Sequence, residues 1–218
     1  MLKTLHSFYP GVTKRVATVL GLPQSPSINQ DGGILFDGDD WTYYNWAADP
    51  DAQQFAINWL AAMGAKPGDS VIYGTNTMIG GLVAWMASEG YNMVDSLTVP
   101  FNAFTYNTYK VAIVRLEDVV WIPETYISYV QQGGSVYLQG GTSTPPLNNI
   151  FPNAFGVNYG SIVTASGGVT PGTGLFTGVG SLPENNPNEL SLIGTQSTII
   201  WNSNTYDVMA TYKLAYNL

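Results

Sequence analysis

Acidic side chains gather at two places in the sequence where they could act together. Asp37, Asp39 and Asp40 form one group, and Glu117 and Asp118 form the other. Clustered carboxylates suit a hard cation such as Mg²⁺ or Ca²⁺, and a pair about 5–9.5 Å apart suits acid–base cleavage of a glycosidic bond. The EF-hand spacing is absent, however, and a turn that caps helix ends explains the same residues without a ligand. We therefore assign no metal ion and no catalytic residue here.

Each acidic group follows a short apolar run, and so do two polar turns. The runs are Ile34–Phe36, Ser70–Tyr73, Val111–Val114 and Ser135–Leu138. Stretches with helical periodicity separate them, which predicts an α/β fold with a mostly parallel sheet covered on both faces. Ligands of such sheets bind beyond the carboxyl ends of the strands. The candidate ligand-binding residues at that edge are Asp37, Asp39, Asp40, Thr75, Asn76, Glu117, Gly140, Gly141 and Thr142.

The helices between these runs carry recognisable signals. Asp49 and Pro50 begin one helix, and Phe55, Trp59 and Met63 lie along its apolar stripe. Further helices are predicted over 79–90, 123–133 and 147–155, and a strand over 97–99. After Gly156 the composition shifts to Gly, Thr, Ser and Asn, and β-structure is predicted over 191–200 and 206–212. This last part is expected to extend the same sheet with antiparallel strands.

We expect two regions along the chain. Residues 1–32 form an N-terminal appendage with a short helix over 11–22, and residues 33–218 form a single α/β domain. Pro23 and Pro26 interrupt regular structure between them.

The groups needed for nucleophilic catalysis are missing from the sequence. Cysteine is absent, and the one histidine, His6, lies in the predicted appendage. The turn around Gly140-Gly141-Thr142-Ser143 does not match the G-x-S-x-G elbow. It remains a tight turn whose backbone N–H groups could hold an anion. Neither a dinucleotide fingerprint nor a P-loop occurs, so no cofactor is assigned.

Composition narrows the range of partners. The net charge is −8, and only Lys3, Lys14 and Arg15 cluster, which excludes nucleic acid as a principal ligand. Charged residues make up 10% of the chain, so neutral hydrogen-bonding groups dominate its polar surface. Such a surface suits a carbohydrate-like ligand, a partner protein or a second copy of the chain. No apolar run approaches the ~20 residues of a membrane span, and no secretory leader is evident, so a cytoplasmic location is the default.

Four aromatic residues follow the first acidic group. Trp41, Tyr43, Tyr44 and Trp46 could stack on a sugar ring or anchor a protein interface. They could equally form an apolar cover over the edge of the sheet.

The middle of the chain resembles a known superfamily. The segments Val111–Arg115 and Tyr126–Val130, with Gln132–Leu138 leading to Gly140-Gly141-Thr142, give the pattern Y-V-x-x-G-G-x-V-Y-L-x-G-G. This arrangement resembles the class I glutamine-amidotransferase-like superfamily over residues 33–212, and within it ThuA-like and related members without the catalytic cysteine. The resemblance implies a flavodoxin-like three-layer sandwich. It also implies lost activity, since the turn Gln139–Thr142 has no nucleophile and no histidine follows.

Three hypotheses follow from the sequence. The leading one is a non-catalytic ligand-binding or protein-interaction module of amidotransferase-like fold. The second is a carboxylate- or metal-dependent hydrolase acting on a carbohydrate-like substrate. The third is a self-assembling structural protein, which the low charge and the Thr- and Asn-rich C-terminal third favour.

Overall fold

The computed structural model describes residues 31–74, 79–98, 108–119, 122–141, 149–165 and 167–214. The helix predicted over 11–22 lies outside these residues, as do Thr75, Asn76 and Thr142 from the predicted site.

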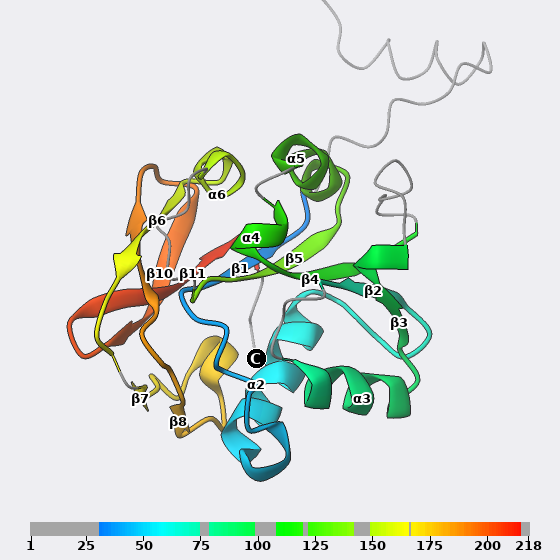
Figure 1. Cartoon of the computed structure of the whole chain (residues 1–218), viewed down its shortest axis with the longest axis horizontal. Helices are drawn as coiled ribbons and strands as arrows, with labels where there is room; N and C mark the ends of the chain where they lie inside the picture. The colour runs from blue at the N-terminus through cyan, green and yellow to red at the C-terminus, as the bar shows by residue number, and fades with distance from the viewer. Residues whose placement is uncertain are drawn as a thin grey trace, which may run out of the picture. The chain divides into compact units, whose positions relative to one another are not determined.

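A seven-stranded sheet runs through the described part of the chain, in the order β10-β11-β1-β5-β4-β2-β3 (Figure 1). Its strands are β1 (Ile34–Asp37), β2 (Ser70–Tyr73), β3 (Asn92–Asp95), β4 (Val111–Arg115), β5 (Ser135–Gln139), β10 (Ser197–Ser203) and β11 (Tyr206–Tyr212). Strands β1 to β5 are parallel to one another. Strand β11 pairs antiparallel with β1 on one side and with β10 on the other. The prediction of a mostly parallel sheet with an antiparallel extension is confirmed.

Helices cover both faces of this sheet (Figure 1). One face carries α2 (Pro50–Ala62) and α3 (Gly80–Ser88), which share a buried apolar cluster with β1 and β5. The other carries α4 (Leu116–Val119), α5 (Pro123–Gln131) and α6 (Ile150–Ala154), which pack into a second cluster. Three short 3₁₀ turns, η1 (Trp46–Ala48), η2 (Ser96–Thr98) and η4 (Gly174–Phe176), complete the helical structure of the described residues. None of the helices there is both long and apolar enough to cross a membrane.

The C-terminal region is more divided than the sequence predicts. The segment 191–200 is not one strand, because a turn separates β9 (Asn188–Leu192) from β10. Strand β9 pairs with β6 (Val157–Ile162) in a separate two-stranded sheet, and β7 (Gly168–Val169) pairs with β8 (Ser181–Leu182) in another. Of the strands described after Gly156, only β10 and β11 therefore extend the main sheet.

The strand predicted over 97–99 is wrong, since 96–98 form η2 instead. Strand β3 ends at Asp95, whose carboxylate accepts a hydrogen bond from the Leu97 backbone N–H at 2.9 Å. The Thr98 hydroxyl donates to the Asp95 carbonyl at 2.7 Å. Asp95 thus starts a turn, and the apolar Leu97 is left 80% exposed.

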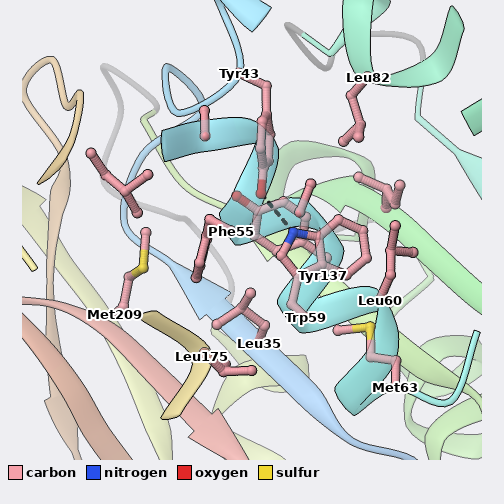
Figure 2. Close-up of a cluster of buried hydrophobic side chains, with 14 of the residues drawn as sticks. Leu35, Tyr43, Phe55, Trp59, Leu60, Met63, Leu82, Tyr137, Leu175 and Met209 are labelled. Carbon is pink, nitrogen blue, oxygen red and sulfur yellow. Dashed lines mark hydrogen bonds between the residues drawn. The ribbon is translucent and has the colours of Figure 1, made fainter. Parts of the chain in front are cut away.

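Helix α2 begins and packs as its sequence predicts. The Asp49 side chain accepts a hydrogen bond from the Ala52 backbone N–H at 3.0 Å, which caps the first turn. Phe55, Trp59 and Met63 are buried against the sheet. Figure 2 shows the Trp59 indole N–H donating to the Tyr43 hydroxyl, at 2.6 Å, inside this cluster.

Replacing Trp59 with Phe is expected to lower the free energy of unfolding by about 1–3 kcal/mol, because the substitution leaves a void and removes the donor to the buried Tyr43 hydroxyl. Urea denaturation followed by circular dichroism measures the change. Trp46→Phe is the control, since Trp46 is only partly buried and packs at the margin of the cluster. A loss of equal size in both variants would contradict the role given to the Trp59 hydrogen bond.

Candidate functional site

Two neighbouring parallel strands lead to helices on opposite faces of the sheet. Strand β1 leads to α2 on one face, whereas its neighbour β5 leads to α6 on the other. Ligands of α/β sheets bind where adjacent strands exit to opposite faces, and here the two loops are joined by hydrogen bonds from Gly140 to Asp37 and from Gly141 to Gly38. Asp37 and Gln139 end these two strands and are paired in register. The structure thus places Asp37 at the point of the carboxyl edge that the sheet topology favours.

Polar side chains at the carboxyl ends of β1, β5 and β4 form a row across the sheet. Asp37 is in register with Gln139 on β5, which is in register with Arg115 on β4. Residues in register on neighbouring strands direct their side chains to the same face. Asp37 and Gln139 each come two residues after an apolar residue of the same strand, Leu35 or Tyr137. Both of these apolar residues belong to the cluster under α2.

Asp37 is fully buried and accepts three hydrogen bonds. The Tyr137 hydroxyl donates to its Oδ2 at 2.5 Å and the Thr42 hydroxyl to the same oxygen at 2.9 Å. The Asp39 backbone N–H donates to Oδ1 at 3.1 Å. Burial raises the pKa of Asp37 to about 7, an effect that the Tyr137 hydrogen bond opposes and the Asp39 charge reinforces. Burial therefore keeps Asp37 protonated well above the pH range of an ordinary aspartate.

Asp39 joins two loops that lie far apart in the sequence. Its Oδ1 accepts the Asp40 backbone N–H at 2.8 Å, and its Oδ2 accepts the backbone N–H of Asn185, which is 146 residues away. Burial raises the pKa of Asp39 to about 6 against the effect of these two hydrogen bonds. The segment before β9 is thus held against the loop that follows β1.

Glu184 is a third acid at this site, and sequence reasoning missed it. Only 5% of the residue is exposed, and neither carboxyl oxygen has a hydrogen-bond partner among the described residues. Burial raises the pKa of Glu184 to about 10, with further contributions from the charges of Asp37 and Asp39. No motif marks this position, since Glu184 lies in the polar run Glu184–Asn188, which looks like an ordinary solvated turn.

Gln139 is buried at the same edge. Burial raises the pKa of Tyr137 well above its ordinary value. The Gln139 side chain lies beside the Tyr137 hydroxyl and partly opposes this rise in the pKa. Even so, neither amide atom of Gln139 completes a hydrogen bond with a described residue. A buried amide without partners is uncommon in folded proteins.

An ion-pair cluster borders the acids on the β4 side. Arg115 lies 3.0 Å from the Asp40 carboxylate and 3.6 Å from that of Glu117. The structure therefore brings the predicted residues Asp40 and Glu117 together, through an arginine that sequence reasoning missed. Burial raises the pKa of Asp40 in spite of the opposing charge of Arg115. The guanidinium occupies the position between carboxylates that the sequence suggested for a hard cation.

No three His, Cys, Asp or Glu side chains in the described part of the chain are arranged to hold a metal ion. Asp118, from the second acidic group, instead accepts a hydrogen bond from the Arg115 backbone N–H at 3.0 Å. This contact fits the capping alternative for that group.

The predicted glycines Gly140 and Gly141 lie where three loops meet. The Gly140 N–H donates to the Asp37 carbonyl at 2.7 Å. The Gly141 N–H donates to the Gly38 carbonyl at 2.8 Å and to the Asn188 side chain at 2.9 Å. Gly141 has a φ of +76°, a conformation that favours glycine. Both N–H groups donate within the protein in this structure.

The four aromatic residues after the acidic loop divide into two kinds. Tyr43 is buried and stacks edge-on against Tyr137 with ring centroids 5.8 Å apart, and Trp46 packs tilted beside it at 5.9 Å. Trp41 and Tyr44 stack face to face at 3.9 Å, and Tyr44 is 53% exposed. One pair thus belongs to the apolar cover, and the other leaves an aromatic face near Asp40.

Comparison of the chain with protein-family models, with curated proteins and with solved structures finds no match.

Proposed function

We propose that the chain is a non-catalytic binding protein with a flavodoxin-like, amidotransferase-like fold, and that it holds a small hydroxyl-rich molecule at the carboxyl edge of its sheet. The observation that carries the proposal is the buried pair Gln139 and Glu184, whose polar side-chain atoms have no partner among the described residues. Buried polar groups normally have hydrogen-bond partners, and a bound ligand would supply them.

The surroundings of this pair favour a carbohydrate-like ligand. Carboxyl groups with raised pKa can both donate and accept hydrogen bonds near neutral pH, as sugar hydroxyls do. The stacked Trp41 and Tyr44 next to Asp40 offer an apolar face for a pyranose ring. Exposed aromatic rings beside hydrogen-bonding groups suit sugar recognition better than an extended protein interface, which would bury a larger apolar centre.

The proposed fold relationship is supported by the strand and turn that carried the resemblance. The turn after β5 reads Gln139-Gly140-Gly141, where amidotransferases place the nucleophile, and Gly140 packs against another loop instead. Five parallel strands between two helical layers are compatible with a flavodoxin-like arrangement. With no cysteine in the chain, amidotransferase chemistry has no nucleophile of the required kind.

Sugar binding should weaken when the exposed ring is removed. We expect Tyr44→Ala to lower the affinity for a neutral sugar about 2- to 12-fold, which is what one aromatic stacking contact contributes. Glucose, galactose, mannose and N-acetylglucosamine are screened by the shift they cause in the thermal unfolding midpoint, and titration calorimetry then gives the affinity. Leu97→Ala is the control, because it removes another exposed apolar side chain far from β1 in the sheet. A sugar response that is equal in both variants would refute the stacking role.

A second function, carboxylate-dependent glycoside hydrolysis, is favoured by one observation. Asp37 and Asp39 have pKa values of about 7 and about 6, so one acid can be protonated while the other is ionised. Hydrolysis of an aryl glycoside by purified protein, lost in Asp39→Asn and retained in Leu97→Ala, would support this function over simple binding. Absence of turnover with retained sugar binding would support the binding protein.

A further inference from the structure

Three carboxyl groups share the edge of the sheet without a positive partner. Asp37, Asp39 and Glu184 make no ion pair with any described residue, and the charges of the two aspartates act on Glu184. Arg115, which lies two strands from Asp37 in the sheet, is paired with Asp40 and Glu117. Buried carboxyls are normally paired or hydrogen-bonded, because desolvating the ionised form is costly.

The three carboxyls differ in how much hydrogen-bonding capacity they have left. Both oxygens of Asp37 and both of Asp39 already accept hydrogen bonds from the protein. Both oxygens of Glu184 are unused, and so is the carbonyl oxygen of Gln139, which is in register with Asp37. The site therefore offers three carboxyl groups together with spare acceptors.

We propose that Asp37, Asp39 and Glu184 form a subsite for a protonated primary amine, with the Gln139 carbonyl as a further acceptor. This inference rests on the proposed function and names the charged group of the ligand, as in an amino sugar. An ammonium group carries three N–H donors and no acceptor, which matches a site rich in unused acceptors. A neutral hydroxyl would fill the hydrogen bonds but could not replace the positive charge of the proton that a carboxyl gives up when it ionises.

Binding of the amine replaces a carboxyl proton with the ammonium group of the ligand. The ammonium group enters as a cation, and a carboxyl proton leaves to solvent, so the charge of the site is balanced throughout. Binding must therefore strengthen as the pH rises from 5 to 8, because protons compete for the carboxyls at the lower pH. Methylammonium stays charged over this range, since an alkylamine has a pKa near 10.4.

The test compares methylammonium chloride with sodium chloride at equal ionic strength, in thermal unfolding of the whole chain at pH 8 and at pH 5. We expect methylammonium to raise the midpoint by about 2–4 °C at pH 8, with a much smaller rise at pH 5. Glu184→Gln should abolish the rise at pH 8 while keeping the size of the side chain. Glu189→Gln is the matched control, because Glu189 is an exposed acid on β9 and should leave the response unchanged.

Equal midpoints in the two salts, or a rise that persists in Glu184→Gln, would overturn the amine subsite. The neutral sugars test the proposed function separately. If a sugar stabilises the protein and methylammonium does not, the binding function stands and the amine subsite fails. If methylammonium alone stabilises it, the subsite stands and the sugar class fails.

Discussion

Raising the pH from 5 to 8 is expected to lower the free energy of unfolding by about 3 kcal/mol or more, since one unit of pKa difference corresponds to ~1.4 kcal/mol. The folded-state pKa values of Asp37 and Asp39 are raised to about 7 and about 6, so the folded protein binds more protons than the unfolded chain. Stability from these protons is fully present below pH 4, the ordinary range of an aspartate, and is lost as the pH rises through 6 and 7. Chemical denaturation at several pH values measures the loss.

Glu184, whose pKa is raised to about 10, adds to this loss, and two variants test its contribution. Glu184→Gln removes a buried acid whose pKa is raised, so it should increase stability at pH 8 and make the pH dependence shallower. Glu189→Gln should leave the curve unchanged. The lowered pKa values of Asp31 and Asp51 act in the opposite sense, but only as the pH falls through and below their ordinary range near 4. A stability that is flat or rising between pH 5 and pH 8 would contradict the protonated state of the cluster.

Gly140→Ala is expected to cost about 3 kcal/mol or more, or to prevent folding, because the new Cβ would overlap packed backbone. That Cβ would lie 2.3 Å from the Gly38 carbonyl oxygen and 2.9 Å from the Asn188 side-chain oxygen. Neither atom can move freely, since the Gly38 carbonyl accepts hydrogen bonds from the N–H groups of Gly141 and Asn188. Urea denaturation of the purified variant measures the loss.

The control for this substitution is Gly80→Ala. Gly80 begins α3, and a Cβ there would meet nothing within 4 Å. Alanine favours the helix, so this variant should gain up to about 1 kcal/mol. Similar losses in both variants would show that the loop crossing at Gly140 is not the cause.

Much of the parallel sheet could be predicted from the sequence because its strands are buried on both faces. Runs such as Ile34–Phe36 and Val111–Val114 are continuously apolar, and intervening helices such as the one after Asp49 carry clear signals. Edge strand β3 was missed because its sequence, Asn-Met-Val-Asp, is only partly buried and carries a weak pattern. The small sheet of β6 and β9 could not be predicted, because pairing between short strands far apart in the chain produces no local sequence pattern.

The candidate site could be predicted only in part for the same reason. The order of strands and helices placed Asp37, Asp39 and Gly140 at one edge, and the structure confirms that location. The order of strands and helices could not predict that Glu184 and Asn185 join the site. They reach Asp39 through a loop that comes from much later in the chain. Periodicity describes an element, whereas a contact across 146 residues depends on the whole topology.

The position of β1 in the sheet also bears on how the protein acquires its structure during synthesis. Strand β1 precedes the other described strands in the chain, yet its two neighbours in the sheet, β5 and β11, come much later. Tyr137, which holds the Asp37 carboxyl, follows it by 100 residues. Until β11 emerges, one edge of β1 has no partner strand and stays open to pairing with other chains. Pairing between strands so far apart in the sequence is expected to slow folding, and productive folding should therefore depend on protection of the nascent chain.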